Sequence, residues 1–107
     1  MPDIAITMGD PSGIGPEVVC RALLKMNPTE RQDLCIVGHK DTLERANILI
    51  GGNLKFSSSS GHGVTQLIEV ETPKKRTIID CLATEGGGHA AFGFVQYGVK
   101  LAMSGTV

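Results

Sequence analysis

A glycine-rich run near the start of the chain carries the residues with the clearest chemical potential. It reads Gly-Asp-Pro-Ser-Gly-Ile-Gly-Pro-Glu over residues 9–17. A carboxylate in such a run can bind hydroxyls, an amide or a water-bridged cation, and glycines allow the backbone to approach a ligand closely. The N–H groups that open a following helix can face an anion. The candidate ligand-binding residues are therefore Asp10, Gly13, Ile14, Gly15 and Glu17.

The same spacing also fits a simpler interpretation, in which residues 9–17 form a tight, capped turn that binds no ligand. The spacing alone does not separate the two interpretations. Gly13 is the glycine that we expect to be sensitive to a side chain, if its φ angle is positive. The run does not match Gly-x-Gly-x-x-Gly, so the dinucleotide fingerprint of Rossmann proteins is not predicted.

The elements around this run predict where it lies in the fold. Residues 4–8 are apolar and read as a buried strand, while residues 16–26 place apolar side chains at helical spacing. Pro16 suits the first helical position, and Glu17 brings a negative charge to the first turn. Ligands of parallel α/β proteins bind beyond the carboxyl ends of the strands, and the run lies at such an end.

The rest of the chain continues the alternation of strand and helix. Residues 34–37 read as a second buried strand, followed by a helix that Asp41 or Thr42 caps and Gly51-Gly52 ends. Weaker strand patterns cover 54–56, 66–71 and 77–81, with a polar loop at 57–63. A glycine-rich turn at 84–88 precedes a helix over 89–104. The fold class predicted is α/β with a parallel sheet.

Histidines and cysteines do not form a predicted site. His39 falls in an expected loop, His62 in the polar loop and His89 at a helix start, and none has the spacing of a zinc site. The three cysteines each lie in or beside an apolar run, which favours buried, reduced thiols; these are Cys20, Cys35 and Cys81. No catalytic residue and no metal ligand is predicted within this chain.

Composition limits the classes of function. The 107 residues are 41% hydrophobic and 20% charged, with a net charge of −1. This charge gives no basic face for nucleic acid or an anionic membrane. The amino terminus does not read as a signal peptide, and no apolar run approaches the ~20 residues of a membrane-spanning helix. We therefore expect a cytoplasmic protein.

Several motifs together resemble one enzyme family. The string Met-Gly-Asp-Pro-Ser-Gly-Ile-Gly-Pro-Glu at 8–17 resembles the amino-terminal signature of the 4-hydroxythreonine-4-phosphate dehydrogenases. Cys-Ile-Val-Gly at 35–38 with Leu-Glu-Arg at 43–45, and the segment 84–107, look like later parts of the same family. Residues 52–80 match poorly, in a region where the family varies. The shorter Gly-Ile-Gly-Pro-Glu core also looks like the isocitrate and isopropylmalate dehydrogenases, whose fold the family shares.

The resemblance implies a function for a longer protein. Residues 1–107 would be the amino-terminal part of an α/β dehydrogenase that oxidises and decarboxylates 4-phosphooxy-threonine for pyridoxal phosphate biosynthesis. NAD or NADP and a divalent metal (Zn, Mg or Co) would be the cofactors, and the full-length enzyme would be a homodimer. Residues 10, 13–15 and 17 would border the cofactor or the substrate cleft.

The same resemblance implies what this chain lacks. The family's metal-binding histidines and phosphate-binding residues lie beyond Val107, so the 107-residue chain is expected to be an inactive, truncated fragment. Two other interpretations stay open. The protein is a dehydrogenase of another four-carbon phosphorylated hydroxy acid, such as phospho-threonate or phospho-erythronate, or it is a non-catalytic remnant that serves as an interaction module.

Overall fold

The computed structural model describes residues 3–59, 61, 63–70 and 85–107. The elements in chain order are β1 (Ile4–Thr7), α1 (Gly15–Leu24), α2 (Pro28–Arg31), β2 (Leu34–Gly38), α3 (Lys40–Leu49), β3 (Phe56–Ser57), β4 (Thr65–Glu69) and α4 (Glu85–Met103). The predicted alternation of strand and helix is confirmed for these residues. The expected strand at 77–81, together with His62 and Cys81, lies outside them.

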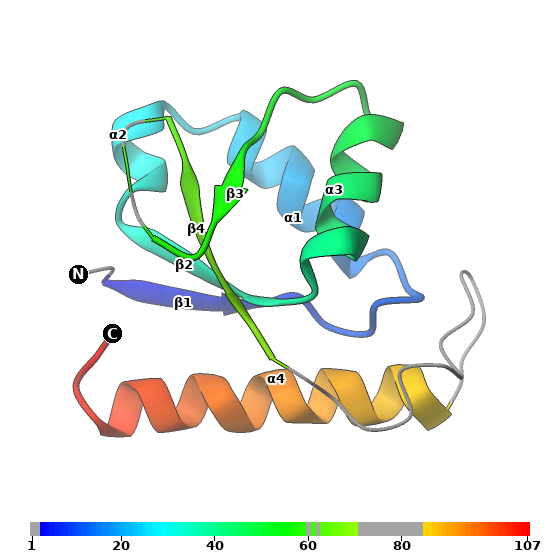
Figure 1. Cartoon of the computed structure of the whole chain (residues 1–107), viewed down its shortest axis with the longest axis vertical. Helices are drawn as coiled ribbons and strands as arrows, with labels where there is room; N and C mark the ends of the chain where they lie inside the picture. Colours follow the sequence, from blue (N-terminus) through cyan, green and yellow to red (C-terminus); the bar gives the residue numbers. More distant parts are fainter. Residues whose placement is uncertain (1–2, 60, 62, 71–84) are drawn as a thin grey trace.

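The four strands form one parallel sheet in the order β1-β2-β4-β3. Helices α1 and α3 lie on one side of this sheet, and the long helix α4 lies on the other side (Figure 1). The parallel α/β class predicted from the sequence is therefore confirmed. The strand β2 lies between two partners and is buried along its whole length, as expected of a central parallel strand.

The core forms where the apolar faces of the helices meet the sheet. Its buried members are Met8, Cys20, Leu23, Leu34, Ile36, Val37, Leu43, Ala46, Leu54, Phe56, Leu67, Ala90 and Phe94. On α4, the buried line runs through Ala90 and Phe94, whereas Val95 is exposed. Thr7 faces this helix, because a Cβ atom on Gly98 would lie 3.3 Å from its Cγ2 atom.

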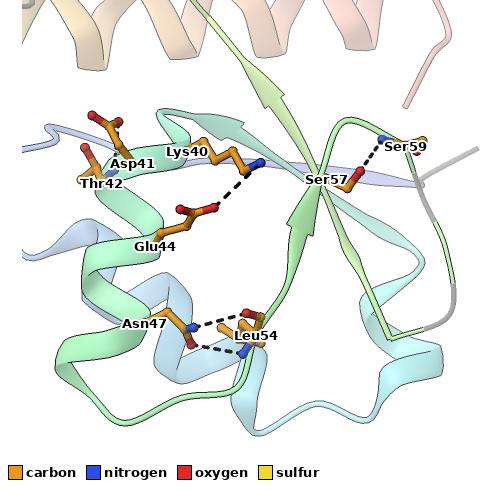
Figure 2. A network of polar contacts seen from close by, with 8 residues as sticks. All are labelled: Lys40, Asp41, Thr42, Glu44, Asn47, Leu54, Ser57 and Ser59. Atoms are coloured by element: carbon orange, nitrogen blue, oxygen red, sulfur yellow. Dashed lines mark hydrogen bonds and ion pairs between the residues drawn. The ribbon is translucent and has the colours of Figure 1, made fainter.

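The connection from α3 to β3 is fixed by one buried amide. The Asn47 side chain accepts a hydrogen bond from the Leu54 N–H and donates one to the Leu54 carbonyl, each at 3.2 Å (Figure 2). Gly52 lies so close to this amide that a Cβ atom there would collide with Asn47 Oδ1. Burying an amide is favourable only when its hydrogen bonds are made, and here the backbone of Leu54 makes both.

Helix boundaries differ from the sequence predictions in four places. Helix α1 begins at Gly15, so Pro16, which was expected at the first helical position, is its second residue. The short helix α2 was not predicted, although Asn27 and Glu30 form a capping box across its first turn. The prediction that Asp41 or Thr42 caps α3 is wrong, because α3 begins at Lys40 and His39 is the N-cap residue. Helix α4 begins at Glu85, so the glycines expected in a turn at 84–88 form part of its first turns.

The arrangement predicts a weak thermal transition for the isolated 107-residue chain. The strands β1 and β3 are the outer strands of the described sheet, and α4 contacts β1 and β2. A parallel sheet needs cover on both faces, and open strand edges favour association. We expect a low, broad melt or aggregation in circular dichroism and light scattering. A sharp, reversible melt of a monomer would contradict this expectation.

Candidate functional site

The glycine-rich run forms the connection between β1 and α1 at the carboxyl end of β1, as predicted. Gly9 adopts a positive φ of 82°, which glycine accepts without steric cost. Gly15 opens α1 and packs directly on the residue that follows β1, since a Cβ atom on Gly15 would collide with the Met8 carbonyl oxygen. The glycines that this backbone path requires are therefore Gly9 and Gly15. Gly13 has no positive φ, and the sensitivity expected there from its φ angle is not found.

The neighbouring strand leaves room for this packing. The Met8 side chain is buried against Gly38 at the end of β2, where a Cβ atom would lie 2.8 Å from Met8 Cβ. The Met8 N–H donates to the Val37 carbonyl at 2.9 Å and so continues the ladder between β1 and β2. Because glycine occupies position 38, the Met8 side chain can be buried at the end of β2.

Asp10 accepts hydrogen bonds from other residues of the same turn. Its Oδ1 atom accepts hydrogen bonds from the Ser12 N–H at 2.9 Å and from the Ser12 hydroxyl at 2.6 Å. The Asp10 carbonyl accepts a third from the Gly13 N–H at 3.0 Å. Such bonds are typical of an Asp-initiated turn, and they stabilise one loop conformation.

The other predicted ligand residues differ in exposure. Gly13 is exposed, and the Ile14 side chain is 77% exposed although it is apolar. Glu17 lies in the first turn of α1 and forms a 2.9 Å ion pair with Arg21 on the same helix. Ile14 is the N-cap residue of α1, and its side chain makes no capping hydrogen bond. The tip of the loop, Gly13 and Ile14, is thus the part that faces outward.

The amino-terminal end of α1 has the character of a polar ligand site. Helix N-termini carry partial positive charge on unpaired N–H groups, which favours an anionic group of a ligand. Pro16 contributes no N–H, so the donors of this turn come from its neighbours. A phosphate or carboxylate fits this environment chemically, and the exposed Ile14 provides apolar surface beside it.

Sequence reasoning missed one element of this region. A Cβ atom on Gly87, in the first turn of α4, would lie 2.8 Å from both Cγ and Oδ2 of Asp10 and would collide with Oδ1. The start of α4 therefore contacts the loop, although the two are far apart in the sequence. The triple glycine at 86–88 was the available signal for a close approach.

His39 is not the loop residue that the sequence suggested. It follows β2 directly and is 1% exposed. Its ring makes an edge-to-face contact with Phe94 of α4, with centroids 4.9 Å apart and an interplanar angle of 88°. This geometry is favourable for aromatic pairs and links the end of β2 to α4. His89 lies within α4 and is exposed.

The cysteines that the structure describes are buried and unreactive. Cys20 and Cys35 are free thiols, and the Cys20 Sγ atom donates to the Leu43 carbonyl at 3.6 Å between α1 and α3. Burial raises the pKa of Cys20 to about 11, and it also raises the pKa of Cys35. Thiols with raised pKa values are protonated at neutral pH and are poor nucleophiles.

Two further properties are the grouping of possible metal-binding side chains and the suitability of the helices for crossing a membrane. Within the described ranges, His, Cys, Asp and Glu side chains form no group of three or more that is able to hold a metal ion. None of the helices in those ranges combines the length and apolar character needed to cross a lipid bilayer.

Known proteins resemble this chain in sequence and fold, although no protein-family model matches it. A Fusobacterium nucleatum protein with the provisional name D-threonate 4-phosphate dehydrogenase is 31% identical over 94% of the chain. A 4-hydroxythreonine-4-phosphate dehydrogenase from Desulforapulum autotrophicum is 29% identical over 99% of it. These matches cover 32% and 33% of the two relatives, so the chain spans about a third of the length of the curated relatives it matches.

A solved structure extends the similarity to three dimensions. The crystal structure of a 4-hydroxythreonine-4-phosphate dehydrogenase from Burkholderia phymatum superposes with a TM-score of 0.80 at 30% identity. That match covers all of this chain and 34% of the solved one. The resemblance to the 4-hydroxythreonine-4-phosphate dehydrogenases, which the sequence motifs predicted, is therefore confirmed.

The packing of the loop predicts unequal roles for two of its glycines. Gly15→Ala should lower the stability of the chain by roughly 1–3 kcal/mol, because the new methyl group would displace the backbone from Met8. Gly13→Ala is the matched control, since its Cβ atom would meet nothing nearer than 3.5 Å. Urea unfolding of both variants measures the difference. Equal losses of stability would contradict the packing described here.

Proposed function

We propose that this chain forms the loop-bearing α/β part of an NAD(P)-dependent, metal-assisted dehydrogenase that oxidises and decarboxylates 4-phosphooxy-threonine. The observation that carries the proposal is the similarity over the whole chain, in sequence and fold, to a 4-hydroxythreonine-4-phosphate dehydrogenase of known structure. In this proposal the reaction belongs to pyridoxal phosphate biosynthesis. The enzyme works in the cytoplasm as a homodimer, with no nucleic acid or membrane partner.

Within this proposal, the run 9–17 borders the bound cofactor. Gly13 and Ile14 contact the ligand, because they are exposed at the tip of the loop. Asp10 and Gly15 support them from within the turn, and Glu17 lies in the first turn of α1. The start of α1, where the Ile14 side chain makes no capping hydrogen bond, supplies a favourable environment for a phosphate of the dinucleotide.

The chemistry proposed is shared between this chain and residues that it does not contain. When bound, the nicotinamide would supply a hydride acceptor for oxidation of the C3 alcohol, and the divalent metal would supply Lewis acidity to that alcohol. The described residues supply no cluster of metal-binding side chains, so the proposal assigns Zn, Mg or Co to residues outside this chain. The part played by this chain is to hold a preformed loop at the edge of the cleft.

A second substrate follows from one specific observation. The Fusobacterium nucleatum protein is named for D-threonate 4-phosphate, and it covers 94% of this chain at 31% identity. That compound is also a four-carbon phosphorylated hydroxy acid, and the proposed loop faces the cofactor rather than the groups that distinguish the two substrates. Phospho-erythronate belongs to the same class.

Activity should depend on sequence beyond these 107 residues. We expect no turnover by the 107-residue chain with NAD or NADP, a divalent metal and 4-phosphooxy-threonine. We expect turnover by the product of the complete reading frame with 4-phosphooxy-threonine or, under the alternative, with D-threonate 4-phosphate. Inactivity of that product on the whole class would favour a non-catalytic module and contradict the proposal.

Two matched variants of the complete product test the loop itself. Ile14→Asp places a charge at the proposed cofactor edge and should lower kcat/KM by at least roughly tenfold, about 1.4 kcal/mol. Ile48→Asp is the control, because Ile48 is 76% exposed against 77% for Ile14 and lies on α3. Equal kcat/KM values for the two variants would contradict the assignment of the loop to the cofactor site.

A further inference from the structure

We propose that Asp10 is a positioning residue, which holds the glycine-rich loop against the first turn of α4, and that Gly87 is the position on α4 that receives its carboxylate. The inference goes beyond the proposed function, because the contact lies within this chain and needs no cofactor. It gives Asp10 a role different from the direct ligand contact that the sequence suggested. It also gives a reason for a glycine inside a helix, where glycine is unfavourable.

The loop side of the contact fixes the direction of the carboxylate. Two donors from Ser12 hold Oδ1, the backbone N–H at 2.9 Å and the hydroxyl at 2.6 Å. The Asp10 carbonyl is held by the Gly13 N–H at 3.0 Å. Since both ends of the residue are bonded within the turn, the carboxylate cannot rotate away from α4 without breaking bonds to Ser12.

The helix side of the contact is specific to one residue. A Cβ atom on Gly87 would lie 2.8 Å from Cγ and Oδ2 of Asp10 and nearer still to Oδ1. Gly87 is buried, whereas Gly88 is exposed and a Cβ atom there would meet nothing within 4 Å. A carboxylate beside the first turn of a helix, as Asp10 is beside α4, also interacts favourably with the helix dipole. The absence of a side chain at Gly87 thus allows the Asp10 carboxylate to approach α4, and the negative charge of Asp10 makes that approach favourable.

The contact joins the loop to the rest of the sheet. Along α4, Gly98 approaches Thr7 of β1, and Phe94 packs on His39 at the end of β2. The loop is therefore held at two points, by Gly15 on the Met8 carbonyl and by Asp10 on Gly87. A loop fixed in this way presents its tip in one conformation, which lowers the ordering cost when a ligand binds.

Alanine substitutions at the two neighbouring glycines, Gly87 and Gly88, test the contact in the product of the complete reading frame. Gly88→Ala should raise the melting temperature by a few degrees, because alanine favours helix and the new methyl group is unobstructed. Gly87→Ala should lower it, because the methyl group must displace the Asp10 carboxylate. If Gly87→Ala also raises the melting temperature, the contact does not constrain the loop and the proposal is wrong.

The same substitutions in an Asp10→Ala background identify the cause. Without the carboxylate, Gly87→Ala should become stabilising and should resemble Gly88→Ala. If Gly87→Ala lowers the melting temperature by the same amount in the Asp10→Ala background, a side chain at position 87 is unfavourable for reasons unrelated to Asp10. That result would overturn the proposal. The outcome does not depend on catalysis, so failure here is distinct from failure of the dehydrogenase proposal.

Amide hydrogen exchange provides a readout on the loop itself, and it also serves where a broad melt prevents ranking of the variants. Gly87→Ala should accelerate exchange of the Ser12 and Gly13 amides, whose acceptors both belong to Asp10. Gly88→Ala should leave these two amides unchanged. If the Ser12 and Gly13 amides exchange at the same rate in both variants, the positioning role is contradicted. The effect of Gly87→Ala would then be confined to α4 and would not extend to the loop.

Discussion

The carboxyl edge of this sheet depends on the close approach of backbone to backbone at the end of β1. Gly15 lies against the Met8 carbonyl, and Gly38 leaves room for the Met8 side chain. A side chain at position 15 would collide with the Met8 carbonyl and widen the turn between β1 and α1, and a side chain at position 38 would displace the Met8 side chain. Because this turn is tight, the residues after Met8 leave the sheet at once, and Gly13 and Ile14 become the exposed tip of the loop. The apolar core supports this edge but does not determine its shape.

Much of the fold follows from local pattern. The strands over 4–7 and 34–38 and the helices α1 and α4 were predictable, because apolar spacing and glycine or proline boundaries mark them. The start of α3 was not, since the capping position belongs to His39, whose buried ring packs on Phe94 of a distant helix. Tertiary packing overrode the local capping preference of Asp41 and Thr42. The capping box of Asn27 and Glu30 was visible in the sequence but opens only a four-residue helix.

In the candidate site, too, some features could be predicted from the local sequence and others depend on contacts between distant residues. A glycine-rich connection after the first strand could be predicted, and its place at a carboxyl end follows from the parallel topology. The neighbour of Asp10 could not be predicted, because no local rule pairs residue 10 with residue 87. The positive φ is at Gly9 rather than at Gly13, and the residue types alone did not indicate which glycine of the run would adopt it. The direct ligand role of Asp10, Gly13, Ile14, Gly15 and Glu17 stays a prediction.

The proposed function places the edge of a cofactor cleft at this loop, which is glycine-rich, is held on two sides and has an exposed tip beside a helix N-terminus. The chain spans about a third of the length of the curated relatives it matches. The most direct test is a crystal structure of the complete reading-frame product with NAD or NADP bound. The account predicts cofactor atoms within about 4 Å of Gly13 or Ile14, the range of van der Waals contact. A bound cofactor that leaves this loop untouched would contradict it.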